Sequence, residues 1–348
     1  MAIYLHGVTS FSINKLMNKI FLLVIVFFVQ TAYSQSMNSN SIRLGAIRNI
    51  KTLAFGSCNK HYKNQPLWQN LISQSPDLFI WGGDSIYADG KGIGEILAAY
   101  QVQNLVQDYI TFKSQTPIVG IWDDHDFGKN NGGGDYPDKK LSQQYALDFL
   151  EEPVNSFRRK REGIYTSYDF GEAGKRIKII LLDNRYFLDS KKKMILGTAQ
   201  WEWLEKEIKN SKANLHFIVS GISVLTGATF HSEEWADYPE EKSHLRKILK
   251  DSKLPYLYLT GDRHFASIFE KEGEMEFLSS GMTHNISPLL RPYLRGQYPN
   301  TVFAHNYGLI EISWSKSTPR LNLSVRTEKS EALNLKKIIW ESNQWKEL

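Results

Sequence analysis

The stretch from Leu78 to Tyr87 constrains the fold more than any other part of the chain. Its apolar run LFIW is followed by two glycines and then by Asp84 in GDSIY, a pattern typical of a buried strand that ends in a tight turn. In open α/β folds, ligands bind at the carboxyl edge of the parallel strands. We therefore expect Asp84 and Tyr87 to present oxygen donors at such an edge, where the carboxylate of Asp84 is placed to bridge two ions.

Strand-like and helix-like segments alternate along the chain as far as residue 260. The expected strands are 51–57, 78–81, 117–124, 164–170, 176–182, 216–220 and 256–260, and the expected helices are 65–75, 92–114, 140–150, a helix capped by Thr198, and 240–249. From residue 267 onward, short alternating strands indicate antiparallel hairpins. This order predicts a mixed α/β (α+β) fold with a parallel beginning, in which two layers of sheet have helices outside.

The N-terminus reads as an export signal. Lys15 and Lys19 precede the apolar run 20–29, and the small residues Ala32 and Ser34 follow, as in a secretory signal peptide. We therefore expect residues 1–34 to be a signal peptide, 35–50 a lead-in segment and 51–348 a single domain. The protein is then periplasmic or secreted, and a retained N-terminal membrane anchor is the alternative.

Charge and cysteine content narrow the function further. The formal net charge of +5 over 348 residues is a small excess, so nucleic acid is not indicated as a partner. No feature of the sequence indicates an obligate protein partner. Cys58 is the single cysteine, so an internal disulfide is excluded and the thiol is either inert or a ligand.

Metal-binding side chains follow several of the predicted strands. They are Cys58, Asp84 with Tyr87, the run 123–125 (DDH), and Asp262 with His264. Each alone is more typical of a turn, a helix cap or a solvated loop, but parallel strands bring such ends together. Thiolate, phenolate and imidazole suit a first-row transition ion, and carboxylate and amide oxygens suit a harder ion. Two ions about 3.5–4 Å apart form a clamp for in-line displacement at phosphorus.

Seven motifs occur in the order and rough spacing of a known family. They are GSC, GGDSIY, WDDHDFGKNN, LLDNRYF, LGTAQWEWLE, IVSGISVL and LTGDRHF, and FLSSGMTHN and NYGLIEISW follow them. Together they resemble the alkaline phosphatase D family of the calcineurin-like metallophosphoesterase superfamily, over roughly Leu53 to Trp314. The resemblance implies a four-layer αββα sandwich with two mixed sheets flanked by helices.

The resemblance also implies roles for individual residues. It gives Cys58, Asp84, Tyr87 and His264 as the iron(III) site, with Asp84 bridging to a calcium-like ion that Asn130 and Asp262 also bind; other divalent ions are alternatives. It gives Asp124 as a rival or companion of Asn130, His125 as the group that assists the leaving alcohol, and Arg185 as the residue that grips the phosphate. Asn131 competes with Asn130 in the stretch GKNNGGGD, and Asn131 and His284 are further candidates for substrate binding.

The implied activity is that of a metal-dependent phosphoric ester hydrolase, acting as a phosphomonoesterase or phosphodiesterase. A metal-bound hydroxide is expected to attack phosphorus in line, and the substrate is a small-molecule phosphate ester or a phospholipid. A phospholipase C-like phosphodiesterase and a catalytically inactive relative that binds metal or phosphate are the alternatives. The sequence contains neither HEXXH nor a nucleophile elbow, so peptide or acyl ester hydrolysis is disfavoured.

Overall fold

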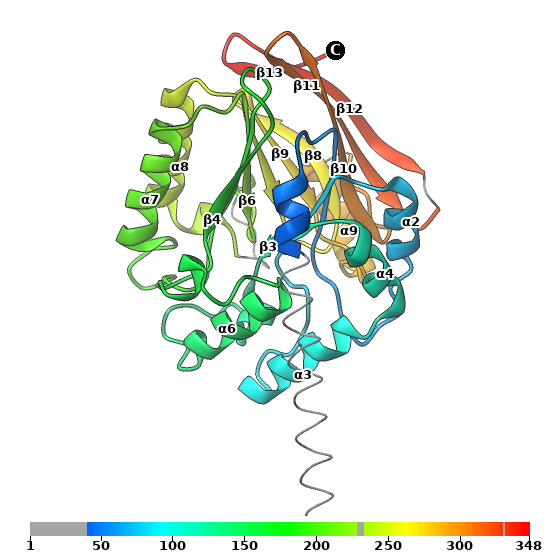
Figure 1. Cartoon of the computed structure of the whole chain (residues 1–348), viewed down its shortest axis with the longest axis vertical. Helices are drawn as coiled ribbons and strands as arrows, with labels where there is room; N and C mark the ends of the chain where they lie inside the picture. The colour runs from blue at the N-terminus through cyan, green and yellow to red at the C-terminus, as the bar shows by residue number, and fades with distance from the viewer. Residues whose placement is uncertain (1–39, 228–232, 299, 330) are drawn as a thin grey trace, which may run out of the picture.

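Two β-sheets face each other with helices on both outer sides (Figure 1). The computed structural model describes residues 40–227, 233–298, 300–329 and 331–348. The predicted signal peptide at 1–34 lies outside these residues. One sheet has seven strands in the order β13-β12-β11-β10-β1-β2-β3, and the other has six in the order β4-β5-β6-β7-β9-β8.

The seven-stranded sheet joins a parallel half to an antiparallel half. The parallel half consists of β1 (Thr52–Gly56), β2 (Leu78–Gly82) and β3 (Ile118–Ile121). The antiparallel half consists of β10 (Asn306–Ser315), β11 (Thr318–Thr327), β12 (Ala332–Glu341) and β13 (Gln344–Glu347), and β10 pairs with β1. The C-terminal hairpins predicted from the sequence thus extend the sheet that the first strands begin.

The six-stranded sheet is parallel at its centre. Its parallel strands are β5 (Ile177–Leu181), β6 (Leu215–Ser220), β7 (Tyr256–Thr260) and β9 (Glu274–Ser279). The strands β4 (Thr166–Phe170) and β8 (Ala266–Lys271) pair antiparallel at the two edges. Both sheets therefore contain a parallel set with a defined carboxyl edge.

Helices cover the outer face of each sheet (Figure 1). Their bounds are α2 (Leu67–Gln74), α3 (Ile93–Asn104), α4 (Gln107–Gln115), α5 (Asp124–Phe127), α6 (Lys139–Phe149), α7 (Gly197–Lys209), α8 (Pro239–Ser252) and α9 (Arg291–Gln297). Short 3-10 turns occur at Phe157–Arg159, Trp235–Asp237 and Pro288–Leu290. Two expectations were wrong: the helix predicted over 92–114 is two helices, and Thr198 lies inside α7, whose N-cap is Leu196 without a side-chain cap.

Apolar side chains of the described residues fill two large layers of core, and a third, smaller cluster contains Phe265 and Leu294. The larger cluster joins the two sheets, and in it the rings of Phe55 on β1 and Phe277 on β9 lie 4.9 Å apart in an edge-to-face arrangement. The second cluster lies between the six-stranded sheet and α7 and α8, with Leu204 and Leu245 among its members. These layers confirm the predicted sandwich of two sheets with helices outside.

The segment before β1 is helical over residues 40–46. The side chain of Asn40 donates to the carbonyl of Ile118 at 2.8 Å and accepts from its N–H at 3.0 Å. The predicted lead-in therefore contacts β3, the edge strand of its sheet, and satisfies backbone groups there.

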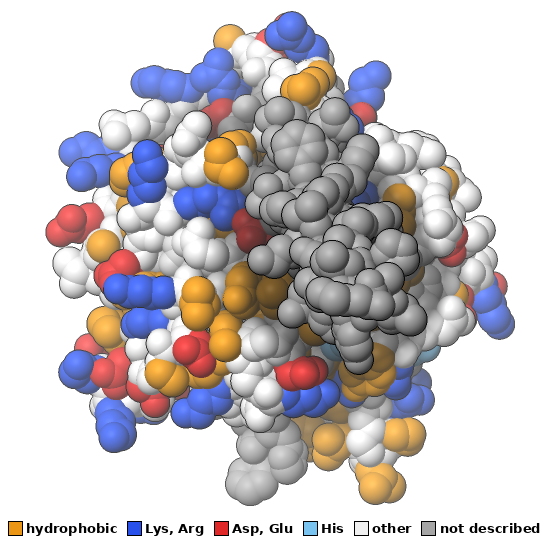
Figure 2. Space-filling view, turned by 60° about the horizontal axis from the view of Figure 1, so that its bottom comes forward, with side chains coloured by type: hydrophobic (Ala, Val, Ile, Leu, Met, Phe, Trp, Pro, Cys, Tyr) orange, Lys and Arg blue, Asp and Glu red, His pale blue; other side chains and the backbone are white. Residues whose placement is uncertain are grey.

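Within the described ranges, no helix combines the length and the apolar character that crossing a bilayer requires. On the face seen in Figure 2, Lys and Arg side chains are scattered among acidic, hydrophobic and uncharged side chains of the described surface.

Candidate metal centre

The carboxyl ends of β1, β2, β3 and β7 meet at one place between the two sheets. This approach depends on glycine: a Cβ on Gly261, just after β7, would lie 2.7 Å from the carbonyl oxygen of Gly82 on β2. Gly83 has φ +97, and a Cβ there would lie 2.6 Å from the Cβ of Asp123. The glycines that flank the predicted strand ends therefore allow donors from both sheets to come within reach of one another.

One group of donors combines sulfur, oxygen and nitrogen. Ligand atoms of Cys58, Asp84 and His264 all lie within 4.8 Å of one another. The hydroxyl of Tyr87 lies 3.2 Å from Asp84 Oδ2 and 3.2 Å from His264 Nε2, and Cys58 Sγ lies 3.6 Å from Asp84 Oδ2. The structure thus brings together the four residues that the resemblance gives as the iron(III) site.

A second group consists of carboxylates. Ligand atoms of Asp84, Asp123, Asp124 and Asp262 lie within 4.8 Å of one another, so Asp84 belongs to both groups. Among the described residues, the buried oxygens Asp123 Oδ2 and Asp124 Oδ1 have no hydrogen-bond partner. Buried carboxylate oxygens without a partner are costly unless a cation neutralises them.

The raised pKa values in this cluster indicate that the protein does not fully neutralise its buried carboxylates. Burial, together with repulsion from the neighbouring aspartates, raises the pKa of Asp84 well above its ordinary value. The pKa of Asp262 is raised to about 7, by burial and by the charge of Asp124. Burial also raises the pKa of the Cys58 thiol and of the Tyr87 phenol. A donor set of this kind fits two cations, one on mixed sulfur, oxygen and nitrogen ligands and one on carboxylates.

Several of these donors occupy left-handed backbone conformations. The φ angles are 59° at Cys58, 50° at Asp84, 70° at Asp262 and 59° at His264. Such angles are uncommon for residues other than glycine, and outliers of this type cluster at functional sites. The tight turns after β1, β2 and β7 thus carry metal-binding side chains at positions whose backbone conformation favours glycine.

His125 lies on α5 and is oriented by a partner on another loop. Its Nδ1 lies 2.5 Å from Asp89 Oδ1, its ring stacks on Tyr87 at 4.0 Å, and its backbone N–H donates to Asp84 Oδ1 at 3.2 Å. Burial lowers the pKa of His125, but the bond to Asp89 and the charge of Asp124 outweigh it, so the pKa is raised. His125 also forms a donor group with Asp84 and Asp124.

Arg185 follows β5 and is completely buried. Its Nε donates to Asp123 Oδ1 at 2.6 Å, and its Nη1 pairs with Glu233. Tyr238 fixes Glu233 in turn, because its hydroxyl donates to Glu233 Oε1 at 2.6 Å. Arg185 Nη2 is buried and has no acceptor among the described residues.

The remaining sequence candidates lie around the cluster. The side chains of Asn130 and Asn131 are exposed, and the backbone N–H of Asn131 donates to Asp124 Oδ2 at 2.7 Å. His284 is buried, its Nε2 lies 3.3 Å from the Tyr87 hydroxyl, and its ring lies 4.1 Å from that of His264. The structure therefore places His284 beside the mixed-donor group and both asparagines at the rim.

Two residues that belong to this arrangement were absent from the sequence prediction, and a third was predicted without a role of its own. Asp123 was named within the run 123–125, and in the structure it joins the carboxylate group and pairs with Arg185. Asp89 and Glu233 act as partners of His125 and Arg185. Their sequence contexts are ordinary polar loops, so the sequence contained no comparable signal for them.

Comparison with known proteins shows to which family the chain is similar. A family model described as PhoD-like phosphatase matches residues 95–285, more than half of the chain, and confirms the resemblance predicted from the motifs. No curated protein matches the chain.

Solved structures show a similar fold at low sequence identity. The structure of PhoD is 17% identical, with a TM-score of 0.65 over 87% of this chain and 72% of that one. GAP50, the anchor in the inner membrane complex of Plasmodium, is 12% identical, with a TM-score of 0.53 over 82% of this chain and 89% of its own. A dimetal phosphatase from Danio rerio is 9% identical, with a TM-score of 0.52 over 84% and 100%. The chain belongs to the PhoD-like phosphatase family and is a metal-dependent phosphoesterase.

Proposed function

We propose that the protein is an exported hydrolase of small-molecule phosphoric esters that binds two metal ions on either side of Asp84. The observation that carries this proposal is that Asp84 belongs to all three donor groups of the centre. A carboxylate shared in this way is suited to bridge two cations. The left-handed backbone at Asp84 supports a functional reason for this residue at this turn.

The donor types favour different ions on the two sides. Cys58, Tyr87 and His264 would bind iron(III) together with Asp84, because sulfur, phenol oxygen and imidazole suit a first-row transition ion. Asp124 and Asp262 would bind calcium together with Asp84, because hard cations prefer carboxylate oxygens. When bound, the ions supply a nucleophilic water near neutral pH and offset charge on the phosphoryl oxygens.

The residues of the chain then position the ester and move one proton. Arg185 Nη2 donates to a non-bridging phosphoryl oxygen, while Asp123 and Glu233 fix the plane of the guanidinium. Asp89 holds His125 through Nδ1, which leaves Nε2 to carry a proton and donate it to the oxygen of the leaving alcohol. In-line attack on phosphorus is the reaction that these two positions serve.

The substitution Asp84→Asn tests the shared carboxylate. Elemental analysis and turnover of a nitrophenyl phosphate monoester and diester are measured side by side, and the variant is expected to lose both metals and both activities. Asp169→Asn is a control, because Asp169 is a partly exposed carboxylate that pairs with Lys178 on β5. Two retained equivalents of metal in Asp84→Asn would refute the bridging role. The parent's ratio of monoester to diester turnover identifies the ester class.

The substitution His125→Ala tests whether His125 is a proton donor or a metal ligand. A proton donor predicts that the variant keeps its metal and loses most activity on esters with poor leaving groups, with little loss on nitrophenyl esters. Loss of one metal equivalent would instead make His125 a ligand, as its place beside Asp84 and Asp124 permits.

Export is proposed from the pattern of residues 1–34 alone. N-terminal sequencing of protein recovered outside the cytoplasm is expected to begin near Gln35. A mature N-terminus at Met1 or Met17 in membrane fractions would favour a retained anchor.

A further inference from the structure

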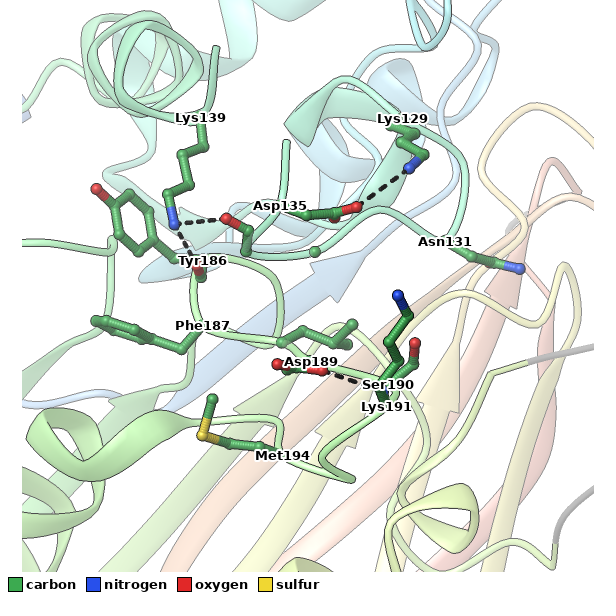
Figure 3. A pocket seen from close by; sticks show the side chains of 13 residues that line it. Lys129, Asn131, Asp135, Lys139, Tyr186, Phe187, Asp189, Ser190, Lys191 and Met194 are labelled. Atoms are coloured by element: carbon green, nitrogen blue, oxygen red, sulfur yellow. Dashed lines mark hydrogen bonds and ion pairs between the residues drawn. The ribbon is translucent and has the colours of Figure 1, made fainter. Parts of the chain in front are cut away.

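A cavity of about 480 Å³ lies between two loops next to the metal centre (Figure 3). One wall is the loop 129–135, which follows α5 beyond the end of β3. The other wall is the loop 186–194, which follows the end of β5. The same strand ends that position Asp124 and Arg185 therefore also position the walls of this cavity.

The two loops are joined tightly. The N–H of Gly134 donates to the carbonyl of Leu188 at 2.8 Å, and Lys139 Nζ donates to the carbonyls of Gly134 at 2.7 Å and of Tyr186 at 3.3 Å. A Cβ on Gly133 would lie 2.5 Å from the carbonyl oxygen of Leu188, so only glycine permits this approach. The walls are thus fixed before a ligand binds, which reduces the entropic cost of binding.

One residue of the cavity lining is linked to the carboxylate group by a hydrogen bond. This residue, Asn131, donates its backbone N–H to Asp124 Oδ2 at 2.7 Å. Tyr186, another lining residue, directly follows Arg185. An ester whose phosphoryl group lies between Asp124 and Arg185 can therefore extend its alcohol toward this cavity on the side of Asn131.

The lining combines apolar side chains with charged ones, which are Lys129, Lys139, Lys191, Asp135 and Asp189. Lys129 is 56% exposed, and its ion-pair partner is Asp135, itself 78% exposed, at a long distance of 3.7 Å. Lys191 is exposed and has no ion pair in the described ranges. Phe187 and Met194 lie on the opposite side from Lys129 and Lys191 (Figure 3).

We propose that this cavity binds the leaving alcohol, and that the preferred alcohol has an apolar body and its own anionic group, a carboxylate or a phosphate. Phe187 and Met194 contact the apolar body, and Lys129 and Lys191 pair with the anion. The ammonium of Lys139 is already bonded to two carbonyls, so it supports the wall. The inference rests on the proposed phosphoric ester hydrolysis and names the substrate class of the same site.

The experiment compares matched esters on the metal-loaded full chain. The carboxylate arm compares 4-carboxyphenyl phosphate with 4-carbamoylphenyl phosphate, and the phosphate arm compares 1,4-phenylene bisphosphate with 4-hydroxyphenyl phosphate. Each ester is supplied as the monoester and as its methyl diester, so that the ester class does not limit the result. The carbamoyl group withdraws more electron density than a carboxylate, so leaving-group chemistry alone favours the neutral ester.

The expected result is a higher kcat/KM for at least one anionic ester over its neutral partner, by about tenfold and mainly through KM. Lys129→Ala and Lys191→Ala should each lower kcat/KM for that anionic ester by about threefold to fivefold, with the neutral ester unchanged. Lys175→Ala is the control, because Lys175 is an exposed lysine between β4 and β5 and does not line the cavity. It should change neither ester.

Equal kcat/KM values for both members of each pair would overturn the proposed subsite while leaving the proposed function intact. Lysine variants that weaken neutral and anionic esters equally would also overturn it, because the ammonium groups would then act on the scissile phosphoryl group. Absence of turnover for every ester by the metal-loaded parent would overturn the proposed function itself, and the subsite with it.

Discussion

Replacement of Arg185 by alanine tests whether its guanidinium serves the reaction or only the fold. The side chain is fully buried between Asp123 and Glu233, and its Nη2 has no partner among the residues that the structure describes. The alanine variant would leave two carboxylates without their counter-charge and would remove the donor that we assign to the phosphoryl oxygen. Both stability and turnover are therefore expected to fall, for separate reasons.

The expected losses of stability and turnover in Arg185→Ala can be estimated from the burial of the groups it contacts. Removing one partner of a buried ion pair destabilises a protein by about 3–5 kcal/mol. Glu233 is 12% exposed, so water relieves part of this cost, and we expect about 3 kcal/mol. That loss lowers the unfolding midpoint by about 5–10 °C. Loss of a donor aimed at charge in the transition state lowers kcat by roughly 100-fold.

Arg158→Ala separates the two effects. Arg158 is also buried, pairs with Glu152 at 3.3 Å, and donates to the carbonyls of Ile164 and Gly120, away from the donor groups. Thermal unfolding, metal content and turnover are measured for both variants well below their midpoints. Similar losses of stability are expected, with turnover lost only in Arg185→Ala. Equal loss of metal and turnover in Arg185→Ala, or lost turnover in Arg158→Ala, would make the arginine structural.

Four further changes test the site and the fold. In iron-loaded protein, Tyr87→Phe should abolish or shift a visible charge-transfer band, and an unchanged spectrum would remove this phenol from the centre. Asp262→Gly relieves both a left-handed φ of 70° and charge repulsion. The metal-free variant should therefore unfold at no lower temperature than its parent, but added metal should raise its unfolding midpoint less. The control Lys253→Gly relieves a φ of 58° at the end of α8 and should leave the stabilisation by metal unchanged. Glu276 is buried and accepts four hydrogen bonds, so alanine should cost about 3–5 kcal/mol and glutamine about 1–2 in urea unfolding, and equal costs would contradict this account. Burial lowers the pKa of His216 in the folded protein to about 4, so as the pH falls the unfolded chain binds a proton before the folded one does. Up to about 3 kcal/mol of the free energy of unfolding should therefore be lost between pH 6.5 and pH 4. His216→Gln should flatten that part of the dependence of stability on pH.

The strand ends could be predicted because two local signals coincide there. Around Asp84, an apolar run and a glycine pair define a buried strand and its end, and a parallel strand order requires neighbouring ends to share an edge. The same reasoning applied at Cys58 and Asp262, and the structure brings their ligand atoms into groups with Asp84. The ends of these strands could be predicted because the apolar run of a buried strand and the glycines that end it are local features of the sequence.

The partners of the site could not be predicted because they depend on tertiary contacts. Asp89 is 36 residues from His125, and Glu233 is 48 residues from Arg185, and each stands in a polar segment that reads as a solvated loop. The break between α3 and α4 at Leu105 has the same origin. No proline or glycine marks it, and packing of α4 against α2 decides where the chain turns.

The conformation of the ligand turns indicates how the centre gains its affinity. Left-handed backbone at Cys58, Asp84, Asp262 and His264 costs roughly 1 kcal/mol at each residue, and the aspartates also repel one another in the protein without metal. Both costs are local, whereas the contacts that oppose them lie in the core between the two sheets, where Phe55 packs on Phe277. That core consists of apolar side chains and includes none of these donors, so we expect it to form without the ions and to hold the donors close before a cation binds. Affinity should therefore arise from relief of repulsion in a preformed cage, and added metal should raise the unfolding midpoint without changing the secondary structure.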